Sequence, residues 1–272
     1  MDLMLDRLRE YYKAHGISAL GFACQHQAAC SAESPRFTTA QESFVGPDYG
    51  TRLPRLVFLS LDSGRLDSNP AIKTMEAVRR RVLADDVHRM PKGKHWYQTH
   101  RLALDLLQPF DSTLRIERVS RYFAHVNGAK CCQNNPEHQK ADRLLFENCR
   151  EYVGGEIRIL RPDILVTQGR EARDAVEHHF RGIERGQFMA DREECEYRIV
   201  ETAPNRAAIW FAAYHPRHYG KFWAQSLSFV NGESPVVLFR LPECRSPYEL
   251  LITSLCNCSG FSKSICSQWL FS

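Results

Sequence analysis

The chain has 272 residues, of which 43% are hydrophobic and 25% charged, and its net charge is +4. These values are ordinary for a soluble globular protein of one large domain or two modest ones, and the mild charge does not by itself indicate a nucleic-acid partner. No apolar run is as long as a membrane span and no signal peptide opens the chain, so we expect a cytoplasmic protein without a membrane partner.

The first half of the chain predicts helices around one buried strand. An amphipathic segment at the beginning of the chain is followed by a segment rich in turn signals, and then by a continuous apolar run. The predicted elements are a helix over 1–16, irregular chain over 21–55, a strand over 55–61, and helices near 70–85 and 96–107. A short, wholly apolar strand is typical of a parallel sheet that is covered on both faces.

The second half alternates strands and helices. The predicted elements are a strand over about 118–126, a helix over about 136–160 bent near 154–155, a strand over 163–167, a helix over 170–181, a small hairpin around 197–201, and a strand over 207–214. Strands separated by helices predict right-handed crossovers and an α/β fold with a four-stranded, mainly parallel sheet. We expect one domain over 1–242 and a flexible tail rich in cysteine and serine over 243–272, and the sequence leaves the oligomeric state open, with a monomer as the expectation.

Polar residues follow three of the predicted strands. Asp62 comes after the first strand, Asn127 after the second, and His215 after the fourth. Because the carboxyl ends of parallel strands face one crevice, we expect these side chains to converge on one small molecule. A carboxylate, an amide and an imidazole are the groups that nucleobase excision requires. Each residue taken singly has a simpler interpretation, since Asp and Asn often cap turns and a histidine often bonds a backbone carbonyl.

Two distant cysteine pairs indicate a metal site. They are Cys24 with Cys30, and Cys131 or Cys132 with Cys149. In a cytoplasmic protein such cysteines are more plausibly thiols or metal ligands than disulfides. Ligand softness and number do not separate a tetrahedral zinc ion from an iron–sulfur cluster.

Several basic clusters could meet phosphates. The clusters are residues 79–81, residues 92–94, and the segment from Arg217 and His218 to 221. A solvated helix face is an equally good interpretation of the arginine triplet at 79–81.

In order and spacing the chain resembles the uracil-DNA glycosylase superfamily, in its iron–sulfur-containing branch. The resemblance covers residues 10–222. It rests on an N-terminal cysteine pair and on the motif segments Leu59-Ser60-Leu61-Asp62-Ser63-Gly64, Asn127-Gly128-Ala129-Lys130-Cys131 with Cys149, Val166-Thr167-Gln168-Gly169, and His215-Pro216-Arg217. It implies a three-layer α/β/α fold and a DNA repair hydrolase that flips uracil or a related deaminated base out of DNA and cleaves its N-glycosidic bond.

The resemblance also implies residue roles. Asp62 and His215 would be catalytic, and Asn127 and Ser60 would contact the base. Further roles follow the same motifs: Trp96, or Tyr97, would stack on the base, Lys130, Arg217 and His218 would contact DNA, and Cys24, Cys30, Cys131 and Cys149 would hold a 4Fe–4S cluster. Cys131 is favoured over Cys132 because it directly follows Lys130, and zinc remains the alternative metal.

The motifs depart from the family pattern in several places. Leu61 stands where this branch has a glutamate, whereas Asp62 falls where other branches carry a water-activating aspartate. The first cysteine pair is spaced C-x5-C, and Arg217 replaces the usual serine. The alternative hypothesis is therefore a catalytically idle iron–sulfur module of the same fold that binds nucleic acid. A further alternative is a zinc-stabilised α/β protein that acts on nucleotides.

Overall fold

The protein is an α/β protein built on one mixed sheet. The computed structural model describes residues 2–32, 36–64, 67–133, 142–190, 193–204 and 206–218. The predicted tail over 243–272, and the part of the predicted domain after residue 218, lie outside these ranges. Among the described residues, no helix combines the length and the apolar composition needed to cross a membrane.

Seven strands form the sheet, in the order β1-β3-β2-β4-β7-β6-β5. The four central strands, β3, β2, β4 and β7, run parallel, and β1, β6 and β5 pair antiparallel at the two sides. Their bounds are β1 Phe44–Val45, β2 Leu56–Ser60, β3 Phe123–Asn127, β4 Ile164–Gln168, β5 Gly182–Ala190, β6 Glu193–Ala203 and β7 Arg206–Ala213. Strands β3 and β4, which follow β2 in the chain, pair on its two sides, and the carboxyl ends of the four parallel strands lie at one edge of the sheet.

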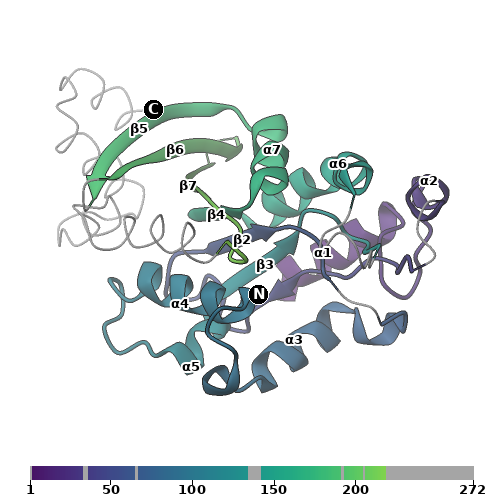
Figure 1. The fold of residues 1–272 in the computed structure, drawn as a ribbon, viewed down its shortest axis with the longest axis horizontal. Helices are drawn as coiled ribbons and strands as arrows, with labels where there is room; N and C mark the ends of the chain where they lie inside the picture. The colour runs from purple at the N-terminus through teal and green to yellow at the C-terminus, as the bar shows by residue number, and fades with distance from the viewer. Residues whose placement is uncertain are drawn as a thin grey trace.

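Helices cover both faces of the sheet (Figure 1). The helices are α1 Asp2–Ala14, α2 Gln27–Ser31, α3 Met75–Ala84, α4 His95–Leu107, α5 Ile116–Val119, α6 Arg143–Leu160 and α7 Arg170–His179, with single 3-10 turns at Pro70–Ile72, Val87–Arg89 and Ser120–Tyr122. One apolar core joins Val57 and Leu59 of β2 to α1, α6 and α7, and the other joins Leu56 and Phe58 to α3, α4 and α5. Alternate residues of β2 therefore feed opposite cores, as expected for a strand buried on both faces.

The prediction of a four-stranded sheet is wrong in its strand count, because the parallel core is extended on both sides. The predicted small hairpin around 197–201 is the long β5–β6 ribbon, which pairs with β7 and continues the sheet beyond it. The predicted strand over 118–126 begins only at Phe123. Val119 and Tyr122 before it belong to short helical turns and are three residues apart, so both reach the core on the α4 side.

Helix α6 is continuous through Gly154 and Gly155, where a bend was expected. These glycines allow close packing between helices instead. A Cβ added at Gly155 would overlap the Tyr11 ring of α1, and one at Gly154 would lie 2.7 Å from the His179 ring of α7. The glycine pair therefore sets how closely α1 and α7 approach α6.

Substituting Gly155 by alanine should destabilise the protein by about 1–3 kcal/mol, because the new methyl group overlaps a packed aromatic ring. Alanine normally stabilises a helix interior relative to glycine by about 0.5–1 kcal/mol, so steric overlap reverses the usual sign. Chemical denaturation would measure the change in the free energy of unfolding. Gly21→Ala is the matched control, because a Cβ added at Gly21 would have no atom within 4 Å among its neighbours in space. An unchanged stability for Gly155→Ala would contradict the packing role.

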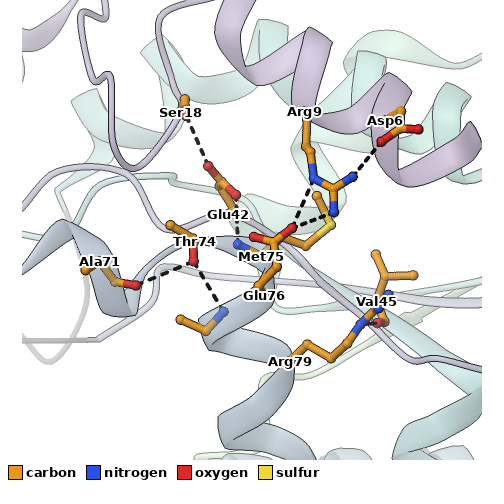
Figure 2. Close-up of polar contacts among 11 residues, drawn as sticks. Asp6, Arg9, Ser18, Glu42, Val45, Ala71, Thr74, Met75, Glu76 and Arg79 are labelled. Atoms are coloured by element: carbon orange, nitrogen blue, oxygen red, sulfur yellow. Dashed lines mark hydrogen bonds and ion pairs between the residues drawn. The ribbon is translucent and has the colours of Figure 1, made fainter. Parts of the chain in front are cut away.

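Helix α1 is attached to α3 through polar contacts (Figure 2). The Arg9 guanidinium joins Asp6 on its own helix to Glu76 on α3, with closest distances of 2.6 and 2.5 Å. The buried Glu42 carboxylate accepts hydrogen bonds from the Ser18 hydroxyl at 3.2 Å and from the backbone N–H of Met75 at 2.8 Å. Glu42 thus supplies an anion at the start of α3, where backbone N–H groups are otherwise unpaired.

Two arginines of the basic triplet at 79–81 have structural contacts. Arg79 Nε donates to the carbonyl of Val45 at 2.8 Å, and Arg81 Nη1 donates to the carbonyl of Ile72 at 3.2 Å. These contacts favour neither phosphate binding nor a purely solvated helix face for Arg79 and Arg81.

Candidate functional site

Three polar side chains lie at the carboxyl edge of the parallel strands. Ser60 ends β2, Asn127 ends β3, and Gln168 ends β4. Ser60 is paired in register with Asn127, and its hydroxyl donates to Gln168 Oε1. All three are buried, with exposed fractions of 3% or less. The pairing of β2 with β3 therefore brings two of the expected site residues together, with Gln168 as a third.

Two histidines complete a hydrogen-bond network around Ser60. His125 Nε2 lies 2.9 Å from Ser60 Oγ, and His95 Nε2 of α4 lies 3.1 Å from it. His95 Nε2 is also 2.9 Å from Gln168 Oε1, which can only accept. The hydrogen-bond pattern thus assigns the proton of His95 to Nε2. Thr99 fixes the amide of Gln168 by accepting from its Nε2 at 3.1 Å.

Both histidines are held neutral. Burial lowers the pKa of His95 to about 4. Burial and then the neighbouring His95 lower the pKa of His125 well below its ordinary value. Neutral imidazoles in this network donate or accept hydrogen bonds and carry no charge at physiological pH.

His215 lies directly beside this network. Its ring is parallel to that of His95, with an interplanar angle of 15° and a centroid distance of 5.2 Å. Its Nδ1 accepts a hydrogen bond from the backbone N–H of Arg217 at 3.2 Å. The proton of the neutral ring therefore belongs on Nε2. Burial, followed by the unfavourable proximity of the His95 ring and of the Arg217 guanidinium, lowers the pKa of His215 to about 3. His215 is therefore a neutral N–H donor.

Gly169 makes this approach possible. Its φ is +113°, and a Cβ there would lie 3.1 Å from Leu61 Cδ2 and 3.4 Å from His215 Cβ. Its backbone N–H donates to the carbonyl of Ala213 at 2.9 Å. Glycine thus allows the ends of β2 and β7 to meet over the end of β4.

Asp62 lies just beyond β2 and is half-buried. Its Oδ2 accepts a hydrogen bond from the thiol of Cys132 at 3.3 Å. The loop after β2 follows the loop after β3 closely, because Gly128 and Ala129 donate backbone hydrogen bonds to the carbonyls of Ser60 and Leu61. Asp62 therefore lies between the strand-end residues and the cysteine-bearing loop.

The structure corrects the expected role of Lys130. Its side chain is 2% exposed, and its Nζ lies 2.7 and 2.8 Å from the two carboxylate oxygens of Glu156 on α6. Ser43 Oγ donates to the same carboxylate at 2.9 Å. An ammonium buried in this way does not meet a phosphate. Arg217 and His218, by contrast, are exposed in the turn after β7, where contact with DNA remains a prediction.

Trp96 is half-buried. Its ring packs edge-on against Phe44, with a centroid distance of 6.4 Å, and its centroid lies 4.8 Å from that of the His125 ring. Trp96 and Tyr97 also line a cavity whose lining residues all belong to the segment 84–97. Among the described residues, none of Ser60, Asn127, Gln168 or His215 lines that cavity. The expected stacking of Trp96 on a base in the strand-end site is therefore not supported by this placement.

The four predicted cysteine ligands lie in one group. Cys30, Cys131 and Cys149 are buried and Cys24 is half-buried, in the core on the α6 side. Burial raises the pKa of Cys131 well above its ordinary value, and the nearby charges of the other three thiols raise it further. Burial also raises the pKa of Cys149 to about 11. Cys132 instead contacts Asp62, so the arrangement favours Cys131 as the fourth member.

Each of three sulfur atoms has a polar neighbour. Asn148 Nδ2 donates to Cys30 Sγ at 3.3 Å, the backbone N–H of Lys130 donates to Cys149 Sγ at 3.3 Å, and the Tyr152 hydroxyl lies 3.5 Å from Cys24 Sγ. Within the ranges that the structure describes, no three His, Cys, Asp or Glu side chains converge closely enough to hold one metal ion. The four thiols thus lie in one region with polar neighbours, but within the described ranges they do not converge as the ligands of one metal ion would.

Four members of the site have no role in the sequence analysis. They are His95, Thr99, His125 and Gln168. The alternation of a strand places His125 on the same face as Asn127, and Gln168 occupies the end of the third motif strand, so both carried a usable signal. His95 and Thr99 come from a helix whose position over the sheet only the folded chain reveals. When the chain is compared with known proteins, neither a family model nor a curated protein matches it.

Proposed function

We propose that the protein is a DNA N-glycosylase of the uracil-DNA glycosylase type, with the corresponding α/β/α fold and a 4Fe–4S cluster. Its substrate would be DNA containing uracil or a related deaminated base, extruded into the crevice at the carboxyl ends of β2, β3, β4 and β7. The observation that carries the proposal is His215, whose neutral ring stacks on His95 of the strand-end network with a centroid distance of 5.2 Å and has its Nδ1 occupied by the Arg217 N–H. A neutral N–H donor suits an oxygen that gains negative charge in the transition state.

In this mechanism the glycosidic bond breaks and its electron pair moves onto the departing base. The Nε2–H of His215 stabilises the base oxygen that gathers this charge, and the Asn127 amide holds the base edge. The Asp62 carboxylate stabilises the cationic sugar or orients the water that attacks it, and the water supplies the new C–O bond. Proton transfer from this water to the carboxylate completes the hydrolysis.

The residues present fit the proposed cluster. Four grouped thiols match the number and type of ligands of a 4Fe–4S centre, and zinc is the alternative metal. Cys24, Cys30, Cys131 and Cys149 would hold it. When bound, the cluster ties distant segments together and adds local charge, and no redox step is required.

Replacing His215 by alanine should lower the rate of base release about 100- to 1000-fold, the usual effect of removing one transition-state donor. Cleavage of a uracil-containing oligonucleotide, followed on a gel after abasic-site cleavage, measures this rate. His178→Ala is the matched control, since His178 is exposed on α7. An equal rate in the His215 variant would contradict the assigned role.

The pH dependence of base release should show no histidine transition near pH 6.5. The folded pKa of His215 is lowered to about 3, so the ring stays neutral throughout pH 5–8 and becomes protonated only below that range. Rates measured across pH 5–8 test this expectation. A fall in rate with a midpoint near 6.5 that disappears in His215→Ala would show that the ring titrates normally and would contradict the assignment.

The alternative, a catalytically idle module that binds nucleic acid, is favoured by one observation. The Ser60 hydroxyl and the Gln168 amide are already hydrogen-bonded to His95, His125 and each other, so a base must displace existing contacts. The idle module would bind DNA with an affinity that falls as salt rises, without releasing a base. Salt-dependent binding without an abasic product would select this alternative.

A further inference from the structure

A cavity is lined by residues of the segment 84–97, and His95 is one of them. It is bordered by the end of α3, the loop that follows, and the first turn of α4, and its volume is about 640 Å³. Volumes of this order are typical of small-ligand sites. Because His95 Nε2 is 3.1 Å from Ser60 Oγ and His95 also lines this cavity, one side chain separates the cavity from the strand-end site.

Aromatic surfaces dominate the α4 side of this cavity. Trp96 and Tyr97 are both half-buried and both line it. The Trp96 ring is held between Phe44, His125 and His100, with centroid distances of 6.4, 4.8 and 5.8 Å. A ring fixed by neighbours on one side and open on the other needs little ordering before a planar ligand stacks on it. The cavity wall therefore suits a nucleobase.

The charges around the cavity are mixed. Arg89 is an exposed partner of Asp86, with Nε 3.3 Å from Oδ2. Lys94, at the N-cap of α4, and Asp85, at the end of α3, are both exposed and both line the cavity. Besides the Arg89–Asp86 pair, the cation Lys94 and the anion Asp85 lie beside the aromatic wall, which matches a nucleotide, whose phosphate is anionic and whose base carries N–H donors. A purely anionic ligand would meet Asp85 and Asp86 unfavourably.

We propose that this cavity binds the nucleotide next to the extruded one, with its base stacked on Tyr97 and Trp96 and its phosphate near Lys94. The proposal rests on the proposed function, because it assumes that a nucleic-acid strand enters the strand-end site. A neighbouring base that stacks on protein has left its own duplex stack. The substrate is therefore a strand that is unpaired on at least one side of the extruded base, so single-stranded DNA is preferred over duplex DNA.

Binding of an unmodified oligothymidylate to the full chain tests this site without requiring catalysis. Titration should quench the intrinsic fluorescence of Trp96, and Trp96→Phe should remove most of the quenching. Tyr97→Ala should weaken binding by roughly five- to 150-fold, the usual range for losing one stacked base, whereas Tyr97→Phe should retain the affinity. Lys94→Gln should lower the salt dependence of binding by about one phosphate contact, whereas Lys13→Gln, an exposed lysine at the end of α1, should not.

The outcomes separate this inference from the proposed function. Base release by the wild type, together with unchanged oligonucleotide binding in Tyr97→Ala and Lys94→Gln, overturns the flanking-nucleotide site alone. Equal affinity for thymidine monophosphate and for the oligonucleotide also overturns it, since a strand is then not required. Duplex binding as tight as single-strand binding contradicts the preference for unpaired DNA. A wild-type protein that neither binds the oligonucleotide nor releases a base overturns both proposals.

Discussion

Lys130→Met should lower the free energy of unfolding by about 3–5 kcal/mol, because it leaves the Glu156 carboxylate buried without its cation. Glu156 is fully buried on α6, and Lys130 Nζ contacts both of its oxygens. Burial raises the pKa of Glu156, and the attraction of Lys130 opposes this rise. Without Lys130 the carboxyl group would take up a proton at a higher pH than in the wild type. Chemical denaturation at pH 7 measures the loss.

Two further variants make this result specific. The double variant Lys130→Met with Glu156→Leu removes both charges, and it should recover most of the lost stability, since apolar replacements of buried ion pairs are often neutral. Lys13→Met, which removes an exposed lysine, should stay within about 0.5 kcal/mol of the wild type. A single variant Lys130→Met as stable as the wild type would contradict the role of the pair.

Cys131→Ala should abolish the proposed iron–sulfur cluster, whereas Cys132→Ala should retain it. The two cysteines are adjacent in sequence and both are buried, yet Cys131 lies among the other three thiols and Cys132 contacts Asp62. The measurement is the iron and acid-labile sulfide content of the purified full chain, together with its visible absorption. About four iron atoms per chain in the wild type and in Cys132→Ala, with loss in Cys131→Ala, is the expected pattern.

Three other results would contradict this expectation. Loss of the cluster in Cys132→Ala alone would exchange the ligand assignment of the two cysteines. A colourless wild type with one zinc ion would replace the cluster by the alternative metal. A wild type with neither metal would leave the four thiols as core residues, and it would remove the cofactor from the proposed function.

The parallel core was predictable because its strands are continuous apolar runs with clear ends. The runs at 55–61, 163–167 and 207–214 correspond to β2, β4 and β7 within one or two residues. The β5–β6 ribbon was underestimated because its sequence is charged and lacks a clear alternation. Pairing with the edge of β7, rather than the ribbon's own pattern, accounts for its length.

The candidate site was predictable only where it depends on strand ends. The sequence pattern predicted that Asn127 follows a parallel strand, whereas its pairing with Ser60 is seen only in the structure. The position of His95 does not follow from the sequence pattern either, because it depends on how α4 packs over the sheet. The burial of Lys130 was also hidden, since the sequence carries no sign that Glu156, 26 residues later, faces the same interior.

The loop over 127–132 contains a proposed base contact at its first residue, a buried cation at its fourth and a proposed cluster ligand at its fifth. Its backbone is tied on three sides, by Ser60, by Thr38 and by the sulfur of Cys149. These hydrogen bonds restrict movement of the short segment between the proposed base contact, Asn127, and the proposed cluster ligand, Cys131. Under the proposed function, we therefore expect removal of the proposed cluster to lower lesion discrimination while the central strands stay folded.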